Sequence, residues 1–555
     1  MNRRNGAKMK ILILIIVLAA ASLLYIRVLD PRTFGAYGDD GVYVTTAKAL
    51  ATGHGYRIVS LPYEPSQTLY PPLYPFLLSL IWRAFPKFPE NLTAMMLLTV
   101  IATLSFLVLS YRYLVRQKYA TEYQALIVVF LAAINWRTMS WSTLVLSDML
   151  CAAISVAGLY LAEKYETEER RRWAIGSVLG IIMGLAFLTR TSAITLIVAV
   201  AAYYMVRRRW RRVLLPVAIA GVFVIGWTVW CSFNRGSFPD ANSEYYAGYV
   251  RCYSECVNYL QALNGASKLM TFARMIGTNF ALLGIGSVPV GCLGFVDGLP
   301  PIVFLSLICL TLVLIAGGSL RQAGKSVRLL HIYLILYFAL HMLLPGSAYD
   351  RYVTSVVPFL LVFLVTELDV LTSAVRAKMK SPGSAIGKIG AAFVGTALLL
   401  SIGLVLFSNG SALYQLSASY SFKKAAGPPR EFAQAIDWIN THTDPSDVLV
   451  CNLDQMYYLY TGRKATASYS LFMLTTVPYQ TRQPRFDEQA NEFLKIAREN
   501  NGGYLVLNSN DFKYESEVPG ESIEAFVEKS PQMFARVFRT EDGRSAIYRI
   551  NITAD

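Results

Sequence analysis

Long apolar runs separated by short polar stretches fill most of residues 1–422. A helix needs about 20 apolar residues to cross a hydrocarbon layer about 30 Å thick, so runs approaching that length are typical of membrane spans. The predicted spans lie at residues 11–29, 92–115, 123–136, 143–162, 174–188, 193–206, 213–231, 302–317, 329–344, 353–371 and 389–407. The pattern therefore predicts a polytopic α-helical membrane protein with about eleven spans.

Two longer segments, residues 30–90 and 232–301, are predicted to be loops outside the membrane. The first contains a short helical run at 42–51 and an apolar run at 73–85. That second run has only about 13 residues, too few to span, and is expected to lie at the interface or to re-enter. In the other loop, glycines and a proline interrupt the apolar stretch 280–295, so an interfacial or re-entrant piece is expected there too.

The pattern changes near residue 423, where amphipathic and alternating segments replace the apolar runs. Gly427-Pro428-Pro429 marks a linker. Helices are predicted at residues 431–440, 487–499 and 523–534, and strands at 448–451, 503–507 and 546–550. We therefore assign residues 1–422 to a membrane domain and residues 423–555 to an α/β domain, which is long enough for its own core.

Composition and charge agree with a membrane protein. The chain is 54% hydrophobic and 16% charged, with a mean hydropathy of +0.42. Its net charge of +15 comes from basic residues clustered between apolar runs, as in loops on the positive, cytoplasmic side of a membrane. This distribution predicts a cytoplasmic N-terminus and an α/β domain outside, and it argues against nucleic-acid binding. Cys252 and Cys256 share the second outer loop, and a disulfide between them stays an open alternative.

One adjacent pair of carboxylates, Asp39 and Asp40, follows the first apolar run and lies between two glycines. A carboxylate beside a membrane surface is suited to act as a general base toward an acceptor hydroxyl, amine or phosphate, or as a metal ligand. Two neighbouring carboxylates also raise each other's proton affinity, which favours the role of a base. The alternative is a polar loop that caps the helix starting near Val42.

Several motifs around and beyond this pair resemble one known family. The acidic pair is followed by Tyr43, an Ala-Lys-Ala-Leu run, Gly-His-Gly and Pro-Pro-Leu-Tyr-Pro. Further similar stretches lie at residues 184–191, 350–353 with Pro358, 435–439, 447–450 and 460–464. Together they resemble the polytopic glycosyltransferases of the GT-C fold that use a polyprenyl-phosphate sugar donor. These are related to protein O-mannosyltransferases, the aminoarabinose transferase of lipid A and the bacterial transferases that decorate lipopolysaccharide cores.

The resemblance implies that Asp39 is the catalytic carboxylate, because it matches the first acid of the family's Asp-Glu pair. Asp40 stands where that pair usually has Glu. Where the aminoarabinose branch has Glu-Lys-Pro-Pro, this chain has Leu69-Tyr70-Pro71-Pro72. Since the carboxylate and the phosphate-binding lysine of that branch are missing, transfer of aminoarabinose to lipid A is disfavoured.

A donor phosphate needs cations or strong hydrogen-bond donors. Arg351, in the stretch before a late span, is the first candidate, and Arg190 is the second. The alternative for Arg190 is a side chain that only snorkels to the interface. Tyrosines are expected to stack on the sugar or to line the lipid groove, with plain interfacial anchoring as the alternative. The remaining candidate substrate-binding residues are Tyr43, Tyr70, Tyr74, Tyr352 and His54, the last with a turn residue as its alternative.

These assignments imply an inverting glycosyltransferase at the outer face of a bacterial inner membrane. A sugar on a polyprenyl phosphate would pass to a lipid, glycan or protein acceptor, and a divalent metal is left open as a cofactor. A lipid or sugar-lipid transporter is the main alternative; it predicts charges buried within spans and internal repeats. A sensor or scaffold that binds a ligand through its outer domain is the second alternative.

Overall fold

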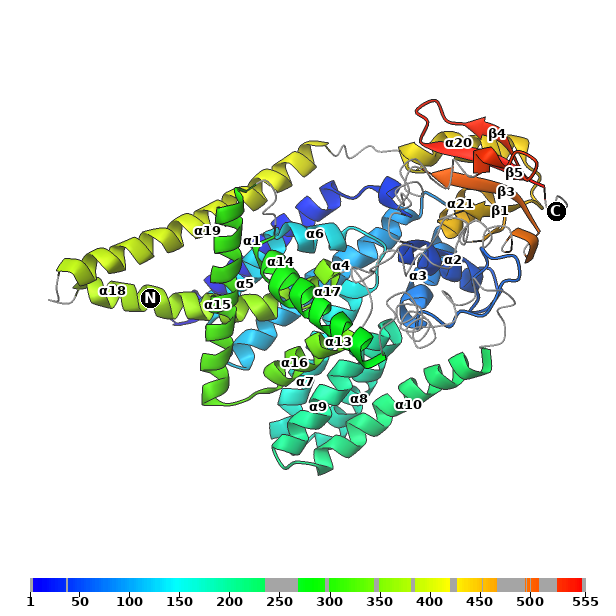
Figure 1. Ribbon diagram of the computed structural model, residues 1–555. Helices are drawn as coiled ribbons and strands as arrows, with labels where there is room; N and C mark the ends of the chain where they lie inside the picture. The colour runs from blue at the N-terminus through cyan, green and yellow to red at the C-terminus, as the bar shows by residue number, and fades with distance from the viewer. Residues whose placement is uncertain are drawn as a thin grey trace.

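A bundle of apolar helices and a smaller unit with a β-sheet form the protein in the computed structural model (Figure 1). The structure describes residues 3–35, 38–234, 268–294, 299–343, 349–380, 385–419, 427–451, 453–466, 495, 497–499, 501–508 and 527–551. The helices of the bundle are α1 (Arg3–Arg27), α4 (Leu92–Arg116), α5 (Glu122–Ile134), α6 (Trp136–Ser142), α7 (Asp148–Thr167), α8 (Arg172–Thr189), α9 (Ile194–Val206), α10 (Arg211–Asn234), α13 (Lys268–Asn279), α14 (Val288–Leu293), α15 (Pro301–Lys325), α16 (Leu329–Leu343), α17 (Tyr349–Thr354), α18 (Val357–Lys380) and α19 (Ala385–Ser419).

Eight helices in the described part of the chain are long and apolar enough to cross a membrane, or nine if the bent pair α5–α6 counts as one span. Three of the eleven predicted spans do not meet this criterion of length and hydropathy. The predicted spans 193–206 and 329–344 correspond to the shorter apolar helices α9 and α16. The predicted span 143–162 corresponds to α7, a helix of 20 residues that does not pass the same test.

The stretch 280–295 differs from its prediction. We expected its glycines and proline to break the helix, but Leu269–Leu293 is long and apolar enough to span. The helix continues because Phe280–Ser287 adopts π-helical hydrogen bonding, and Pro289 then falls in the first turn of α14. Proline is tolerated in a first helical turn, where its missing N–H removes no essential hydrogen bond.

The break between α5 and α6 bends the path of the chain by 61°. Asn135 lies at the break, and its Oδ1 accepts a hydrogen bond from the backbone N–H of Thr138, which caps α6. Its Nδ2 donates to the carbonyl oxygen of Gly291 at 2.9 Å. This buried amide therefore satisfies backbone groups of two helices where an apolar residue would leave them unpaired.

The C-terminal unit contains a five-stranded mixed sheet in the order β2-β1-β3-β5-β4. Its strands are β1 (Val448–Cys451), β2 (Ala465–Thr466), β3 (Gly502–Asn508), β4 (Phe534–Arg539) and β5 (Ser545–Ile550), and its helices include α20 (Arg430–His442) and α21 (Asp454–Thr461). β1 pairs in parallel with β2 and β3, whereas β5 is antiparallel to β3 and β4. The predicted α/β character and the strands at 448–451, 503–507 and 546–550 are confirmed.

Two helices predicted in this unit are not confirmed over their full length. The helix predicted at 523–534 was wrong at its C-terminal end, because Phe534 begins strand β4. Its first residues, 523–526, lie outside the described residues. Most of the helix predicted at 487–499 also lies outside them, although residues 495 and 497–499 are helical.

The first outer loop and the C-terminal unit share one hydrophobic core. This loop contains α2 (Asp39–Ala51) and α3 (Leu73–Ala84), which lie beside α21 and the sheet in Figure 1. Buried residues of α2 and α3 cluster with buried residues of α20, α21 and β1. The backbone N–H of Ala465 donates to the carbonyl oxygen of Ser60 at 2.9 Å. The start of α2, with its acidic pair, is thus packed between the helical bundle and the sheet.

Candidate active site

The N-terminus of α2 orients the two adjacent carboxylates in different directions. Gly38 precedes the helix at φ +69°, a backbone conformation that favours glycine. Asp40 is 1% exposed, and its carboxylate accepts hydrogen bonds from the backbone N–H groups of Gly35 and Gly41, both at 2.8 Å. Burial raises the pKa of Asp40 to about 7. Asp40 therefore holds the turn before α2, while Asp39 contacts the helical bundle.

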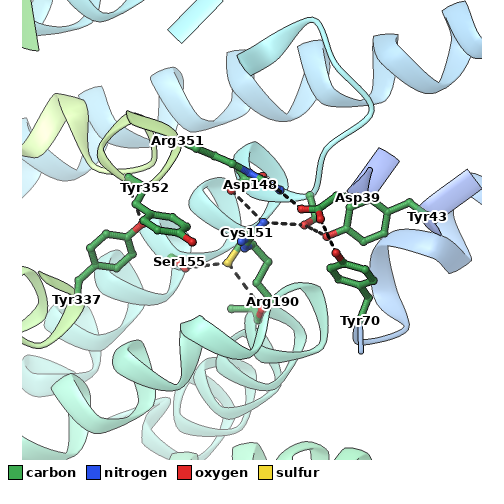
Figure 2. A network of polar contacts seen from close by, with 12 residues as sticks. Asp39, Tyr43, Tyr70, Asp148, Cys151, Ser155, Arg190, Tyr337, Arg351 and Tyr352 are labelled. Carbon is green, nitrogen blue, oxygen red and sulfur yellow. Dashed lines mark hydrogen bonds and ion pairs between the residues drawn. The ribbon is translucent and has the colours of Figure 1, made fainter. Parts of the chain in front are cut away.

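Asp39 contacts two side chains that come from distant parts of the sequence (Figure 2). Its Oδ1 accepts a hydrogen bond from the phenol of Tyr70. Its Oδ2 lies 2.6 Å from Nη1 of Arg351, which belongs to α17. The Asp39 side chain is 20% exposed, so this carboxylate is fixed on two sides and still reachable from solvent.

Arg351 lies between two carboxylates. Its Nε donates to Oδ2 of Asp148 at 2.8 Å, and its Nη2 lies 2.7 Å from the same oxygen. The other oxygen of Asp148 lies 3.0 Å from Nη1 of Arg190. Four charges therefore alternate in the order Asp39, Arg351, Asp148, Arg190, with two negative and two positive groups. Burial makes such a network costly unless each charge is paired, and here each one is.

Four separate elements supply this network. Asp39 starts α2, Asp148 starts α7, Arg351 lies in α17, and Arg190 follows the last residue of α8. The carboxylates of Asp39 and Asp148 both occupy helix N-termini, where the helix dipole favours negative charge. The network is thus a junction at which four helical elements from the first and middle thirds of the chain meet.

A cluster of aromatic rings supports the network on the side of α2 and α3. The ring of Tyr43 lies 4.7 Å from the ring of Tyr70 and 5.0 Å from that of Tyr74. The hydroxyls of these outer rings have separate partners: Tyr74 hydrogen-bonds to Thr99 at 3.1 Å, and Tyr70 donates to Asp39. Tyr43 forms a hydrogen bond to Ser147 at 2.8 Å. Such ring pairs add stabilisation beyond their buried area.

Tyr352 and His54 lie apart from the contacts of Asp39. The ring of Tyr352 packs 4.4 Å from that of His341, on the far side of Arg190 from α2 (Figure 2). His54 is exposed, and its Nδ1 lies 3.1 Å from a carboxylate oxygen of Glu64. The structure thus brings together Asp39, Arg351, Arg190, Tyr43, Tyr70 and Tyr74, and it leaves His54 outside.

Asp148 is the residue that the sequence analysis missed. It lies near the start of the predicted span 143–162, and an acidic residue inside an apolar run is itself a signal of function or of a buried partner. In the structure, Asp148 contacts both of the arginines that the motifs indicated separately.

The donor set does not fit a metal centre. In the part of the chain that the structure describes, no three His, Cys, Asp or Glu side chains gather as potential ligands. The two acids of the charge network, Asp39 and Asp148, have the Arg351 guanidinium between them. A cation of the protein itself occupies the position where a metal would bridge them, so we assign no step to a metal.

Solved structures of membrane proteins share this fold. ArnT from Cupriavidus metallidurans in the apo state is 14% identical, with a TM-score of 0.55, and the match covers 100% of this chain and 99% of that one. The same protein bound to undecaprenyl phosphate is 14% identical at a TM-score of 0.54, covering 97% and 98%. The oligosaccharyltransferase AglB from Archaeoglobus fulgidus, in complex with an inhibitory peptide and a dolichol-phosphate, is 13% identical at a TM-score of 0.53, covering 97% and 74%.

The chain is therefore a multi-pass membrane protein with the GT-C fold seen in ArnT. Residues 70–231, less than a third of its length, match the sequence profile of a family described as dolichyl-phosphate-mannose-protein mannosyltransferase. This segment is therefore similar to that family, which agrees with the resemblance seen in the motifs. No curated protein sequence matches the chain.

Proposed function

We propose that the protein transfers a sugar from a polyprenyl-phosphate donor to an acceptor at the outer membrane surface. The observation that carries the proposal is the contact of Asp39 with Arg351, in a network that Asp148 extends to Arg190. This arrangement sets a partly exposed carboxylate next to two guanidinium groups. A base for the acceptor and cations for a leaving phosphate are the two components that such a transfer requires.

The proposed reaction is a single displacement with inversion at the anomeric carbon. The acceptor's oxygen or nitrogen attacks this carbon, and the bond from carbon to phosphate oxygen breaks. The electron pair of that bond stays on the phosphate oxygen, which gives free polyprenyl phosphate. The proton of the acceptor passes to the Asp39 carboxylate, whose 20% exposure leaves it accessible.

The two arginines would stabilise the negative charge that develops on the phosphate. Arg351 has a buried Nη2 for which no hydrogen bond of good geometry is formed, although this atom lies 2.7 Å from a carboxylate oxygen of Asp148. It is therefore a group with hydrogen-bonding capacity to spare beside the candidate base. Guanidinium groups suit phosphate because their N–H donors are fixed in a planar fork.

The proposed site faces the outer side of a bacterial inner membrane, with the N-terminus in the cytoplasm. The distribution of basic clusters supports this topology. The C-terminal unit packs against α2 and is thus close to the carboxylate, so we assign it a role on the acceptor side. The acceptor itself is a lipid, a glycan or a protein.

Cellular lipids test this proposal. Polyprenyl-phosphate-linked sugars would be extracted from cells with the native chain and from cells with Asp39→Asn, and compared by mass spectrometry. A sugar-lipid that accumulates with Asp39→Asn is expected and would identify the donor. Glu64→Gln is the matched control, because Glu64 lies in the same outer loop but pairs with Lys464 at 2.5 Å. Equal donor levels in all three extracts, at equal protein levels, would overturn the assignment.

A further inference from the structure

Tyr70 is bound in place at both its hydroxyl and its backbone. Its carbonyl oxygen accepts a hydrogen bond from the hydroxyl of Tyr56 at 2.7 Å. Its N–H donates to Oε1 of Gln67 at 3.3 Å, and Gln67 in turn donates from Nε2 to Thr46 on α2 at 3.2 Å. The two prolines that follow restrict the backbone of Tyr70 to extended conformations. The backbone of Tyr70 is therefore tied to the helix that begins with Asp39.

The ring of Tyr70 is also fixed. It packs against Tyr43, whose own hydroxyl is hydrogen-bonded to Ser147 at 2.8 Å. Tyr70 is 4% exposed, so its ring has little room to move and its hydroxyl has a defined direction. That direction leads to Oδ1 of Asp39.

Among the described residues, Asp39 has one hydrogen-bond donor on each oxygen: Tyr70 donates to Oδ1 and Arg351 to Oδ2. A carboxylate oxygen has two lone pairs, so one donor on each oxygen leaves capacity for the proton of an acceptor.

We propose that Tyr70 is a positioning residue that fixes the Asp39 carboxylate in the orientation for proton abstraction. This inference rests on the proposed function, because it assigns Tyr70 a part in that reaction. Tyr70 acts through Asp39 and takes no proton itself. It differs from the role expected from the sequence, in which Tyr70 contacts the sugar or the lipid.

The test compares kcat and KM of Tyr70→Phe with those of the native protein. Membrane vesicles with the native chain or a variant would supply the acceptor. They would receive polyprenyl-phosphate-linked sugar lipids extracted from cells with Asp39→Asn, and the release of polyprenyl phosphate would be measured over a range of donor concentrations. We expect kcat of Tyr70→Phe to fall about ten- to a hundredfold, the effect of one hydrogen bond to a charged group. The KM for the donor should change by less than about twofold.

Tyr25→Phe is the matched control, since it removes a buried tyrosine hydroxyl that donates to the carbonyl oxygen of Ala133 at 2.7 Å instead of to Asp39. Its kcat and its KM for the donor should stay close to the native values. Tyr70→His keeps a ring with a hydrogen-bond donor, so its kcat is expected to be higher than that of Tyr70→Phe. This variant also serves as the test if Tyr70→Phe fails to accumulate in cells.

Two results would overturn the inference while leaving the proposed function intact. One is a Tyr70→Phe variant with the native kcat and the native KM for the donor. The other is a raised donor KM with unchanged kcat, which would make Tyr70 a substrate contact. Native vesicles that release no polyprenyl phosphate would instead refute the proposed function, and the role of Tyr70 with it.

Discussion

Replacing Asp148 by Asn removes one negative charge from between two arginines while keeping the shape of the side chain. Asp148 is 5% exposed, Arg351 8% and Arg190 16%, so the partners of the lost charge are largely shielded from water. Breaking a buried ion pair by neutralising one member costs about 3–5 kcal/mol, because the remaining charge is left without compensation. Arg351 keeps its contact with Asp39, so we expect the lower end of this range for Asp148→Asn, about 3 kcal/mol.

Asp350→Asn is the matched control, because it is the same substitution in an ion pair of different exposure. Asp350 lies 2.6 Å from Arg137, but the two side chains are 31% and 23% exposed. Exposed pairs contribute about 0–1 kcal/mol, so this variant should stay close to the native protein. The contrast between the two variants isolates burial from the chemistry of the substitution.

The assay is thermal unfolding of the detergent-solubilised full chain. The measured quantity is the fraction of protein that still elutes as a monodisperse peak after heating to each temperature. We expect a midpoint several degrees below native for Asp148→Asn and little change for Asp350→Asn. Adding Arg190→Gln to Asp148→Asn should cost less than the sum of the single changes, because their contact is already broken. Equal midpoints for Asp148→Asn and Asp350→Asn would refute the view that the buried network stabilises the helix junction.

Two further predictions concern the start of α2. Burial raises the pKa of Asp40 to about 7 from 3.8, so the folded state binds the proton more tightly than the unfolded one, and stability should fall as pH rises from about 4 through about 7. The melting temperature of the native protein should therefore drop between pH 5 and pH 8, with a loss of no more than about 4 kcal/mol in the free energy of unfolding. Asp40→Asn should make the melting temperature depend less on pH. An equal dependence on pH in both proteins would contradict the burial argument. In Gly41→Ala the new Cβ would lie 2.8 Å from Cβ of Gln455, which should cost about 1–3 kcal/mol of stability. Gly221→Ala, where nothing lies within 4 Å, should unfold at the native temperature or slightly above, and a similar loss in both would argue against the contact of α2 with α21.

Local sequence patterns were enough to predict the helices of the bundle and most of the sheet. The apolar run of α4 and the amphipathic helix α20 follow from periodicity alone. Periodicity failed where hydrogen bonding left the α-helical register, as in the π-helical segment before Pro289. It also failed at Phe534, where strand β4 begins although its sequence, Phe-Ala-Arg-Val-Phe-Arg, does not alternate between apolar and polar residues.

The candidate site could be predicted residue by residue but not as an arrangement. Motifs indicated Asp39, Arg190 and Arg351 separately, and their roles in catalysis stay predictions. Their link through Asp148 depends on contacts between residues more than 200 positions apart, such as that of Arg351 with Asp148. No local pattern encodes such a contact. The direction of the Tyr70 hydroxyl was likewise beyond the sequence, since it follows from ring packing against Tyr43.

The most direct test of the account is the single-turnover rate of sugar transfer by the purified protein and by Asp39→Asn in liposomes. The donor would be the polyprenyl-phosphate-linked sugar that accumulates in cells with this variant, and its binding would be measured in parallel. Removing a general base typically costs about 10²- to 10⁴-fold in rate. We predict a loss of this size for Asp39→Asn with donor binding retained. A transfer rate within about twofold of native would contradict the assignment of Asp39 as the catalytic base.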